Sequence, residues 1–171
     1  LVTNFSSTYG NATFLMNVGV YGLFILGYYN LIGATFNGVT FGIIFCMLAC
    51  CNSGSHPGNV WPIMLGYVVG SFGFSALSGL AGGTYAMTIN AQAIAIGLCF
   101  ANGLSPITSK YGWFWGMVSA VMHFLLVTSV PNMHGGFCLY NGGFTAAVIC
   151  VLLVPVLEKC VKTKAEKAAA K

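Results

Sequence analysis

Residues 14–35 read FLMNVGVYGLFILGYYNLIGAT and contain no charged side chain. They belong to a longer uncharged stretch, because the first charged residue of the chain is Lys110 and the next is Glu158. Charged residues make up 5% of the chain, whereas about a quarter is typical of a soluble domain. A surface this poor in charge requires lipid as its solvent, so the sequence predicts an integral membrane protein.

Apolar segments recur along the chain at residues 14–35, 38–51, 60–77, 87–103, 113–130 and 139–157. A helix needs about 20 apolar residues to cross the hydrocarbon core, so this length of chain allows five or six crossings. The runs are continuous, whereas a β-barrel would show short segments of alternating hydrophobicity. We therefore predict an all-α polytopic bundle of about five to six transmembrane helices with broken or re-entrant segments.

The two ends of the chain differ from this apolar body. Residues 1–13 form a polar N-terminal segment, residues 14–157 the transmembrane domain, and residues 158–171 a basic tail with five lysines. Positive charge stays on the cytoplasmic side, so we expect the C-terminus, the loop at Lys110 and the turn at residues 52–59 in the cytoplasm. We expect the membrane to be a bacterial inner (cell) membrane. The N-terminus lies on that side if the second apolar segment crosses fully, and on the other side if it is re-entrant.

Three clusters place an Asn-Gly pair beside hydroxyl residues at the edge of an apolar segment, at residues 35–42, 102–108 and 140–145. Asn-Gly favours turns, and a helix broken there leaves backbone groups unpaired. Inside a membrane such backbone is tolerated where it is buried in protein or lines a wet cavity. Discontinuous helices of this kind form the solute sites of many transporters. Ordinary caps and turns are the alternative for each cluster.

Three histidines add titratable groups to this neutral body. His123 lies midway along an apolar segment, where an ionisable residue is a candidate for function or a neutral imidazole bonded to a neighbouring helix. His134 could sense pH on the outer side or cap a turn, and His56 before Pro57 favours a loop turn. The residues predicted to line a solute path are Asn37, Thr40, Asn102, Thr108, His123, His134 and Asn141.

Other kinds of site find little support in the sequence. The seven cysteines contain no CxxC pair, and no carboxylate lies near a histidine, so we expect no metal and no cofactor. No nucleophile–base arrangement is visible, so we expect no enzyme. The net charge of +4 comes almost wholly from the tail and predicts topology rather than nucleic-acid binding. Glycines within the apolar segments, such as Gly66 and Gly70, indicate close packing between helices.

Two stretches carry a resemblance to a known family. The first is residues 37–42 followed by residues 54–66, which begin Gly54-Ser55-His56-Pro57-Gly58-Asn59. The second is residues 104–107 and 111–116, followed by His123 and residues 134–144. Their order resembles the C-terminal half of a family of bacterial multi-pass membrane proteins of unknown function, over most of residues 14–158. The resemblance implies many membrane crossings and no particular activity. Family members carry lysines where this chain has Ser55 and Gly58, and they are longer, which implies that a partner chain could supply an N-terminal half.

We interpret the sequence as a membrane transporter or channel for a small solute, whose path is lined by neutral Asn, Thr and Gly helix breaks and by histidines. The neutral lining suits an uncharged or weakly charged solute. The expected partners are the lipid bilayer and either further copies of the chain or a partner chain. The alternative is a non-transporting subunit or scaffold of a larger complex. A polar cavity reaching the breaks would favour transport, and breaks packed dry against other helices would count against it. A different neighbouring chain would favour the subunit.

Overall fold

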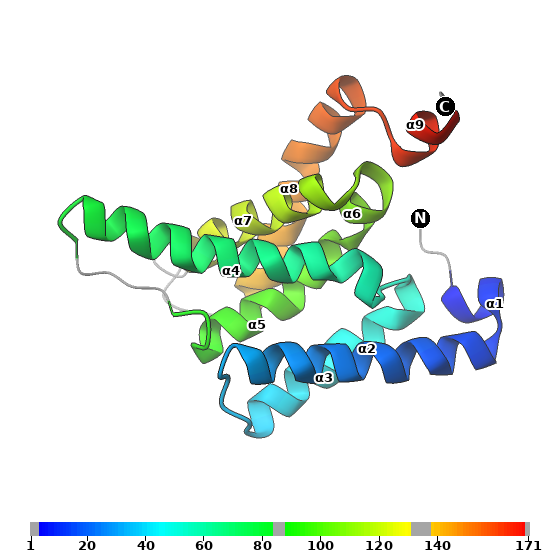
Figure 1. Ribbon diagram of the computed structural model, residues 1–171, viewed down its shortest axis with the longest axis horizontal. Helices are drawn as coiled ribbons and strands as arrows, with labels where there is room; N and C mark the ends of the chain where they lie inside the picture. Colours follow the sequence, from blue (N-terminus) through cyan, green and yellow to red (C-terminus); the bar gives the residue numbers. More distant parts are fainter. Residues whose placement is uncertain (1–3, 84–87, 131–137, 170–171) are drawn as a thin grey trace.

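The computed structural model describes residues 4–83, 88–130 and 138–169 and, within the last range, the side chains from residue 142 onward. These residues form helices joined by turns, with no strand among them, which confirms the predicted all-α fold. In chain order the elements, shown in Figure 1, are α1 (Phe5–Tyr9), α2 (Asn11–Leu31), α3 (Gly38–Ala49), η1 (Cys50–Ser53), α4 (Pro57–Leu80), α5 (Gln92–Ala101), η2 (Asn102–Leu104), α6 (Ser105–Tyr111), α7 (Trp113–Ser129), α8 (Cys138–Cys160) and α9 (Lys164–Ala169).

Membrane-spanning length is reached by three helical stretches among the described residues, Asn11–Leu31, Pro57–Leu80 and Gly142–Ala169. Two shorter apolar helical stretches, Gly38–Ser53 and Trp113–Ser129, accompany them. Each of these coincides with a predicted apolar segment. The predicted helical membrane protein is therefore confirmed, while the count of five to six crossings is approximate.

Local signals in the sequence explain where two of these helices begin. The Asn37 side chain caps α3, since its Oδ1 accepts hydrogen bonds from the backbone N–H groups of Val39 and Thr40 at 3.0 and 3.1 Å. At the start of α4, His56 Nδ1 accepts from the Gly58 N–H at 3.1 Å, and Asn59 Oδ1 accepts from the His56 N–H at 2.9 Å. These reciprocal bonds form a capping box that fixes the first turn of α4.

One end of the bundle, which we call the basic end, gathers segments that are far apart in the sequence. Lys110 Nζ lies 3.0 Å from Glu158 Oε1, which brings α6 beside the end of α8. Asn17 Nδ2 donates to the Ser55 carbonyl at 2.9 Å, which brings the first half of α2 there as well. Figure 1 shows both termini on this side of the molecule. The turn at residues 52–59, Lys110 and the tail thus share one end, the arrangement that the charge pattern predicted.

The helices alternate in direction between the basic end and the opposite end. At the opposite end, Gln92 Nε2 donates to Asn37 Oδ1 at 3.0 Å, so α3 and α5 start side by side. Both run toward the basic end, where Ser55 Oγ lies 3.3 Å from Ser105 Oγ. Since α3 returns the chain to the basic end, α1 and the start of α2 lie at the same end as α9.

Helices α4 and α7 pack closely against each other at two glycines of α4. A Cβ added at Gly66 would lie 2.6 Å from Ala120 Cβ and 2.7 Å from the Met117 carbonyl oxygen. A Cβ at Gly70 would lie 2.9 Å from the ring of Phe124. Glycine at these positions lets the two backbones approach, which supplies helix association where lipid provides no hydrophobic drive.

Candidate buried polar site

The centre of the bundle holds a group of polar side chains that we call the His123 cluster, namely Tyr67, His123, Thr145 and the carbonyl of Gly142. His123 lies midway along α7 and is 0% exposed. Its Nδ1 lies 2.6 Å from the Tyr67 hydroxyl on α4. Its Nε2 lies 2.9 Å from the Gly142 carbonyl oxygen and 3.0 Å from Thr145 Oγ1, both on α8. One imidazole therefore joins three helices.

These partners fix the protonation state of the ring in this arrangement. The Gly142 carbonyl can only accept a hydrogen bond, so Nε2 carries the proton and donates to it. Nδ1 then has a free lone pair and accepts from the Tyr67 hydroxyl. Thr145 Oγ1 donates to the Gly142 carbonyl at 3.0 Å. A neutral imidazole with its proton on Nε2 is thus compatible with the hydrogen bonds to Tyr67 and Gly142, as a buried polar network requires.

A helical segment interrupted by a 3₁₀ turn passes beside this cluster. We call α5, η2 and α6 together the broken segment, residues 92–111. Helix α5 has 10 residues, which is about 15 Å of helix against about 30 Å of hydrocarbon. A Cβ added at Gly97 of α5 would lie 3.0 Å from the Tyr67 hydroxyl oxygen. The broken segment therefore touches the His123 cluster through a residue without a side chain.

Asn102 lies at the break itself and is 1% exposed. Its Oδ1 accepts from the Tyr21 hydroxyl on α2 at 3.2 Å, and its Nδ2 donates to the Met47 carbonyl on α3 at 3.5 Å. Nearer the N-terminal end of α5, the Tyr29 hydroxyl donates to the Ala95 carbonyl at 3.3 Å. At residues 102–104 the chain passes from α5 through the 3₁₀ turn η2 into α6, and the Asn102 amide is buried there and hydrogen-bonded.

The polar contacts of the broken segment continue to the basic end. Ser105 Oγ lies 3.3 Å from Ser55 Oγ, and both residues are buried. Asn59 Nδ2 donates to Ser109 Oγ at 3.1 Å and to the Gly54 carbonyl at 2.9 Å. From the His123 cluster to Ser109, neutral polar groups therefore accompany the broken segment along its length.

The remaining predicted path residues take separate positions. Thr40 is buried and donates to the Thr35 carbonyl at 2.6 Å, while Asn37 is exposed at the opposite end. Thr108 is 1% exposed and packs against Gly116, and its hydroxyl has no hydrogen-bond partner within the described part of the chain. His134 lies outside the described residues, and so does the side chain of Asn141.

Sequence reasoning missed the tyrosines that complete these contacts. Tyr21, Tyr29 and Tyr67 are each 0% exposed. Tyrosine in membrane proteins is commonly found at the lipid–water interface, so a tyrosine inside a long apolar run is the available signal. A buried tyrosine hydroxyl needs a hydrogen-bond partner, and here the partners come from the broken segment and from His123.

A groove of about 470 Å³ lies on the outside of the bundle between α2 and α4. Its lining is apolar apart from the Tyr28 side chain, and it includes none of the predicted path residues. The residues that line it are Leu23, Phe24, Gly27, Tyr28, Leu31, Trp61, Met64, Leu65 and Val68. The groove is thus a feature of the apolar surface, separate from the buried polar groups.

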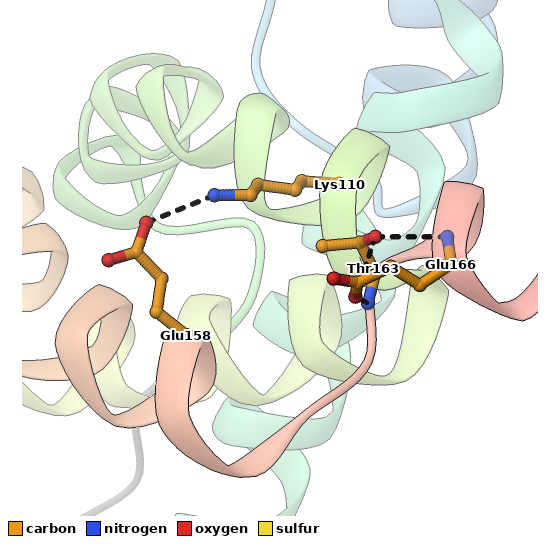
Figure 2. A network of polar contacts seen from close by, with 4 residues as sticks. All are labelled: Lys110, Glu158, Thr163 and Glu166. Carbon is orange, nitrogen blue, oxygen red and sulfur yellow. Dashed lines mark hydrogen bonds and ion pairs between the residues drawn. The ribbon is translucent and has the colours of Figure 1, made fainter.

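Charged groups gather at the basic end, where Figure 2 shows the ion pair between Lys110 and Glu158. In the same view Thr163 and Glu166 form the capping box of α9, since the Thr163 N–H donates to Glu166 Oε2 at 2.7 Å and the Glu166 N–H donates to Thr163 Oγ1 at 3.2 Å. Partial burial lowers the pKa of His56 below its usual value, and the positive charge of Lys164 lowers it further.

The fold and the site define a helical integral membrane protein whose interior holds neutral polar groups around a helical segment with a 3₁₀ turn. Comparison with known families makes the assignment more specific. The model of the family described as "Protein of unknown function (DUF1576)" matches residues 1–159, so the chain belongs to this family. No curated protein and no solved structure matches the chain. The predicted resemblance to a family of unknown function is thereby confirmed.

Proposed function

We propose that the protein is a transporter or channel for a small neutral solute. The observation that supports the proposal is the line of buried neutral groups along the broken segment, from the His123 cluster through Asn102 to Ser105. Short discontinuous helices at membrane depth are a feature of transporter sites. Hydroxyls and amides that hydrogen-bond to one another in a closed state can hydrogen-bond to a passing solute in an open state.

The chemistry of these groups favours an uncharged solute. The buried polar residues are hydroxyls, amides and one imidazole, with no Asp, Glu, Lys or Arg among those that the structure describes. An ion without a compensating charge is costly to bring into such a site. A small solute with hydrogen-bond donors and acceptors would exchange bonds with Asn102 and with the tyrosine hydroxyls at lower cost.

Asn102 packs against α2 and α3, which is the arrangement expected to count against transport. The proposal therefore includes an opening of these contacts. The element suited to move is α5, which is too short to cross the bilayer and touches Tyr67 through a glycine. We further propose that the basic end faces the cytoplasm of a bacterial cell, in keeping with its lysines.

Flux into proteoliposomes tests the proposal. The purified chain is reconstituted, and entry of small neutral solutes is followed by light scattering after an osmotic step. Asn102→Leu is expected to reduce flux at least tenfold, because it removes the amide at the break. Asn30→Leu is the matched control, since Asn30 lies exposed on α2, and its flux should equal that of the unchanged protein. Equal flux in all three, or no flux above empty liposomes for any solute, contradicts the proposal.

A second candidate function is a non-transporting subunit that binds another membrane protein. The specific support is the apolar groove, together with the end of α4, where Phe72, Leu77 and Leu80 are 66%, 67% and 86% exposed. Figure 1 shows this end of α4 extending beyond the other helices. If the groove holds a partner helix, Gly27→Phe would abolish co-purification of that partner, while Gly19→Phe, on an open part of α2, would not.

A further inference from the structure

We propose that His123 is a proton-binding site, and that its protonation drives the Tyr67 hydroxyl to change partners against α5. The proton-binding step stands on the geometry of the His123 cluster alone. Its coupling to solute movement rests on the proposed transport function. The inference identifies a coupling ion for a protein whose described interior holds no carboxylate, which is the group that proton-driven transporters commonly use.

The neutral cluster leaves no free hydrogen-bonding group on the ring. Nε2–H donates to the Gly142 carbonyl, and Nδ1 accepts from the Tyr67 hydroxyl at 2.6 Å. The site for an incoming proton is therefore the Nδ1 lone pair, which Tyr67 occupies. Protonation cannot add a bond to this network without reversing one that exists.

Reversing the direction of the hydrogen bond at Nδ1 changes the hydrogen bonding of the Tyr67 hydroxyl. Once Nδ1 carries a proton, it donates to the Tyr67 oxygen, and the phenolic proton must turn away from the ring to another acceptor. Gly97 of α5 lies directly beside this oxygen, since a Cβ built there would be 3.0 Å from it. The group that must rearrange therefore faces the broken segment, and the same step connects the proton to α5.

Among the described groups of this region, His123 is the proton acceptor, because its neighbours are neutral. From α4 it faces the Tyr67 hydroxyl, and from α8 the Thr145 hydroxyl and the Gly142 carbonyl. The titratable groups that act on Tyr67 are Tyr28, Tyr29 and Cys99, which are neutral acids with ordinary pKa values well above 7. Among the described groups, the charged side chains Lys110 and Glu158 lie at the basic end. No neighbouring carboxylate compensates an imidazolium at this depth.

An uncompensated charge in this position favours a different conformation. A buried imidazolium without a counter-ion is costly, so protonation shifts the population toward states in which water or solute reaches the ring. Moving α5 away from Tyr67 would supply that access. The proton thereby favours the open state of the path.

Nitrogen-15 magnetic resonance of histidine-labelled protein in liposomes tests the proton site directly. Between about pH 8 and pH 5, the range in which histidine commonly titrates, the His123 signals should pass from the neutral Nε2–H tautomer to the imidazolium. His123→Asn assigns the signals, while His56 and His134 keep theirs. If this variant does not fold, Tyr67→Phe assigns them, because it alters the partner of Nδ1 and should move the midpoint to lower pH.

Two outcomes overturn the inference. His123 could stay neutral at the lowest pH, or Tyr67→Phe could leave both its tautomer and its midpoint unchanged. A second experiment imposes a pH gradient across the liposomes and measures solute accumulation, which His123→Asn should abolish. If the unchanged protein moves no solute, the proposed function fails while the resonance result still decides the proton site. If it moves solute but ignores the gradient, the coupling fails alone.

Discussion

Helix α4 packs in opposite ways on its two sides. Toward α7, Gly66 lies against the Met117 backbone and Gly70 against the Phe124 side chain, with no room for a single added Cβ at either glycine. Toward α2, large side chains such as Trp61 and Leu65 leave a groove of about 470 Å³. Tyr67, which lies between the two glycines in sequence, reaches His123 on the closely packed side.

This difference shows how a membrane helix can hold a polar group without exposing it to lipid. Close packing through small residues excludes lipid and fixes the distance between helices, so Tyr67 and His123 meet at 2.6 Å. The loosely packed side has apolar residues that tolerate contact with lipid or with another helix. The polar network therefore depends on glycines that make no hydrogen bond themselves.

The largest effect is expected from filling the closely packed side. Gly66→Val would place side-chain atoms against the Met117 carbonyl and Ala120, and overpacking of this kind costs about 1–3 kcal/mol or more. Gly73→Val is the matched control on the same helix, because nothing lies within 4 Å of Gly73. Thermal unfolding in detergent measures both. Equal melting temperatures for the two variants would mean that α4 and α7 do not pack as described.

A smaller loss of unfolding free energy is expected from disrupting the His123 cluster. His123→Leu keeps much of the volume but leaves the Tyr67 hydroxyl and the Gly142 carbonyl without their partner. Each buried group left unpaired costs about 1–3 kcal/mol in soluble proteins, and interhelical hydrogen bonds in membranes average nearer 0.6 kcal/mol. We expect a loss of about 2 kcal/mol in unfolding free energy. A melting temperature unchanged from the parent would show that the cluster adds nothing to stability.

On the groove side of α4, an added methyl group should raise the unfolding free energy instead of lowering it. Gly27 lines the groove and has nothing within 4 Å of an added Cβ. Gly27→Ala removes backbone freedom from the unfolded chain and is expected to stabilise the helix by about 0.5–1 kcal/mol. Gly66→Ala, at the same kind of residue on the closed side, should destabilise. If both changes stabilise, the contrast between the two sides of α4 is wrong.

The sequence predicted the helical segments well because charge and apolar length decide them. The absence of charge before Lys110 and the runs at 14–35 and 60–77 require helices in lipid, and α2 and α4 lie there. Glycine content was less informative. Gly66 and Gly70 make close contacts, whereas Gly19 and Gly27 make none within 4 Å, because only three-dimensional packing determines which face of a helix meets another.

The candidate site was partly predictable for a similar reason. A histidine at membrane depth and an Asn-Gly break are unusual enough to be noticed, and both His123 and Asn102 are buried and hydrogen-bonded. Their partners Tyr21 and Tyr67 are ordinary members of apolar runs. A tyrosine that anchors at an interface and one that donates to a buried imidazole look alike in sequence, so the pairing required the fold.

The smallest expected effect on stability comes from the cap at the start of α4, the helix whose two sides are compared above. His56 caps this helix through Nδ1, which accepts from the Gly58 N–H and must therefore be neutral. Partial burial and Lys164 lower the pKa of His56 in the folded protein, whereas the unfolded value is about 6.5. Below that pH the unfolded chain binds the proton first, so stability is full above about 6.5 and falls as the pH drops through the folded-state pKa.

Comparison with a cap that does not titrate isolates this contribution. His56→Asn keeps a side chain that caps helices well and should remove part of the acid-side loss in melting temperature while leaving the neutral-pH value nearly unchanged. Lys164→Gln should make the loss smaller and complete at a higher pH, because it removes one cause of the lowered folded-state pKa. A melting temperature with the same pH profile in all three proteins would show that His56 is not the titrating cap. The start of α4 would then be fixed by Pro57 and Asn59 without a contribution from the imidazole.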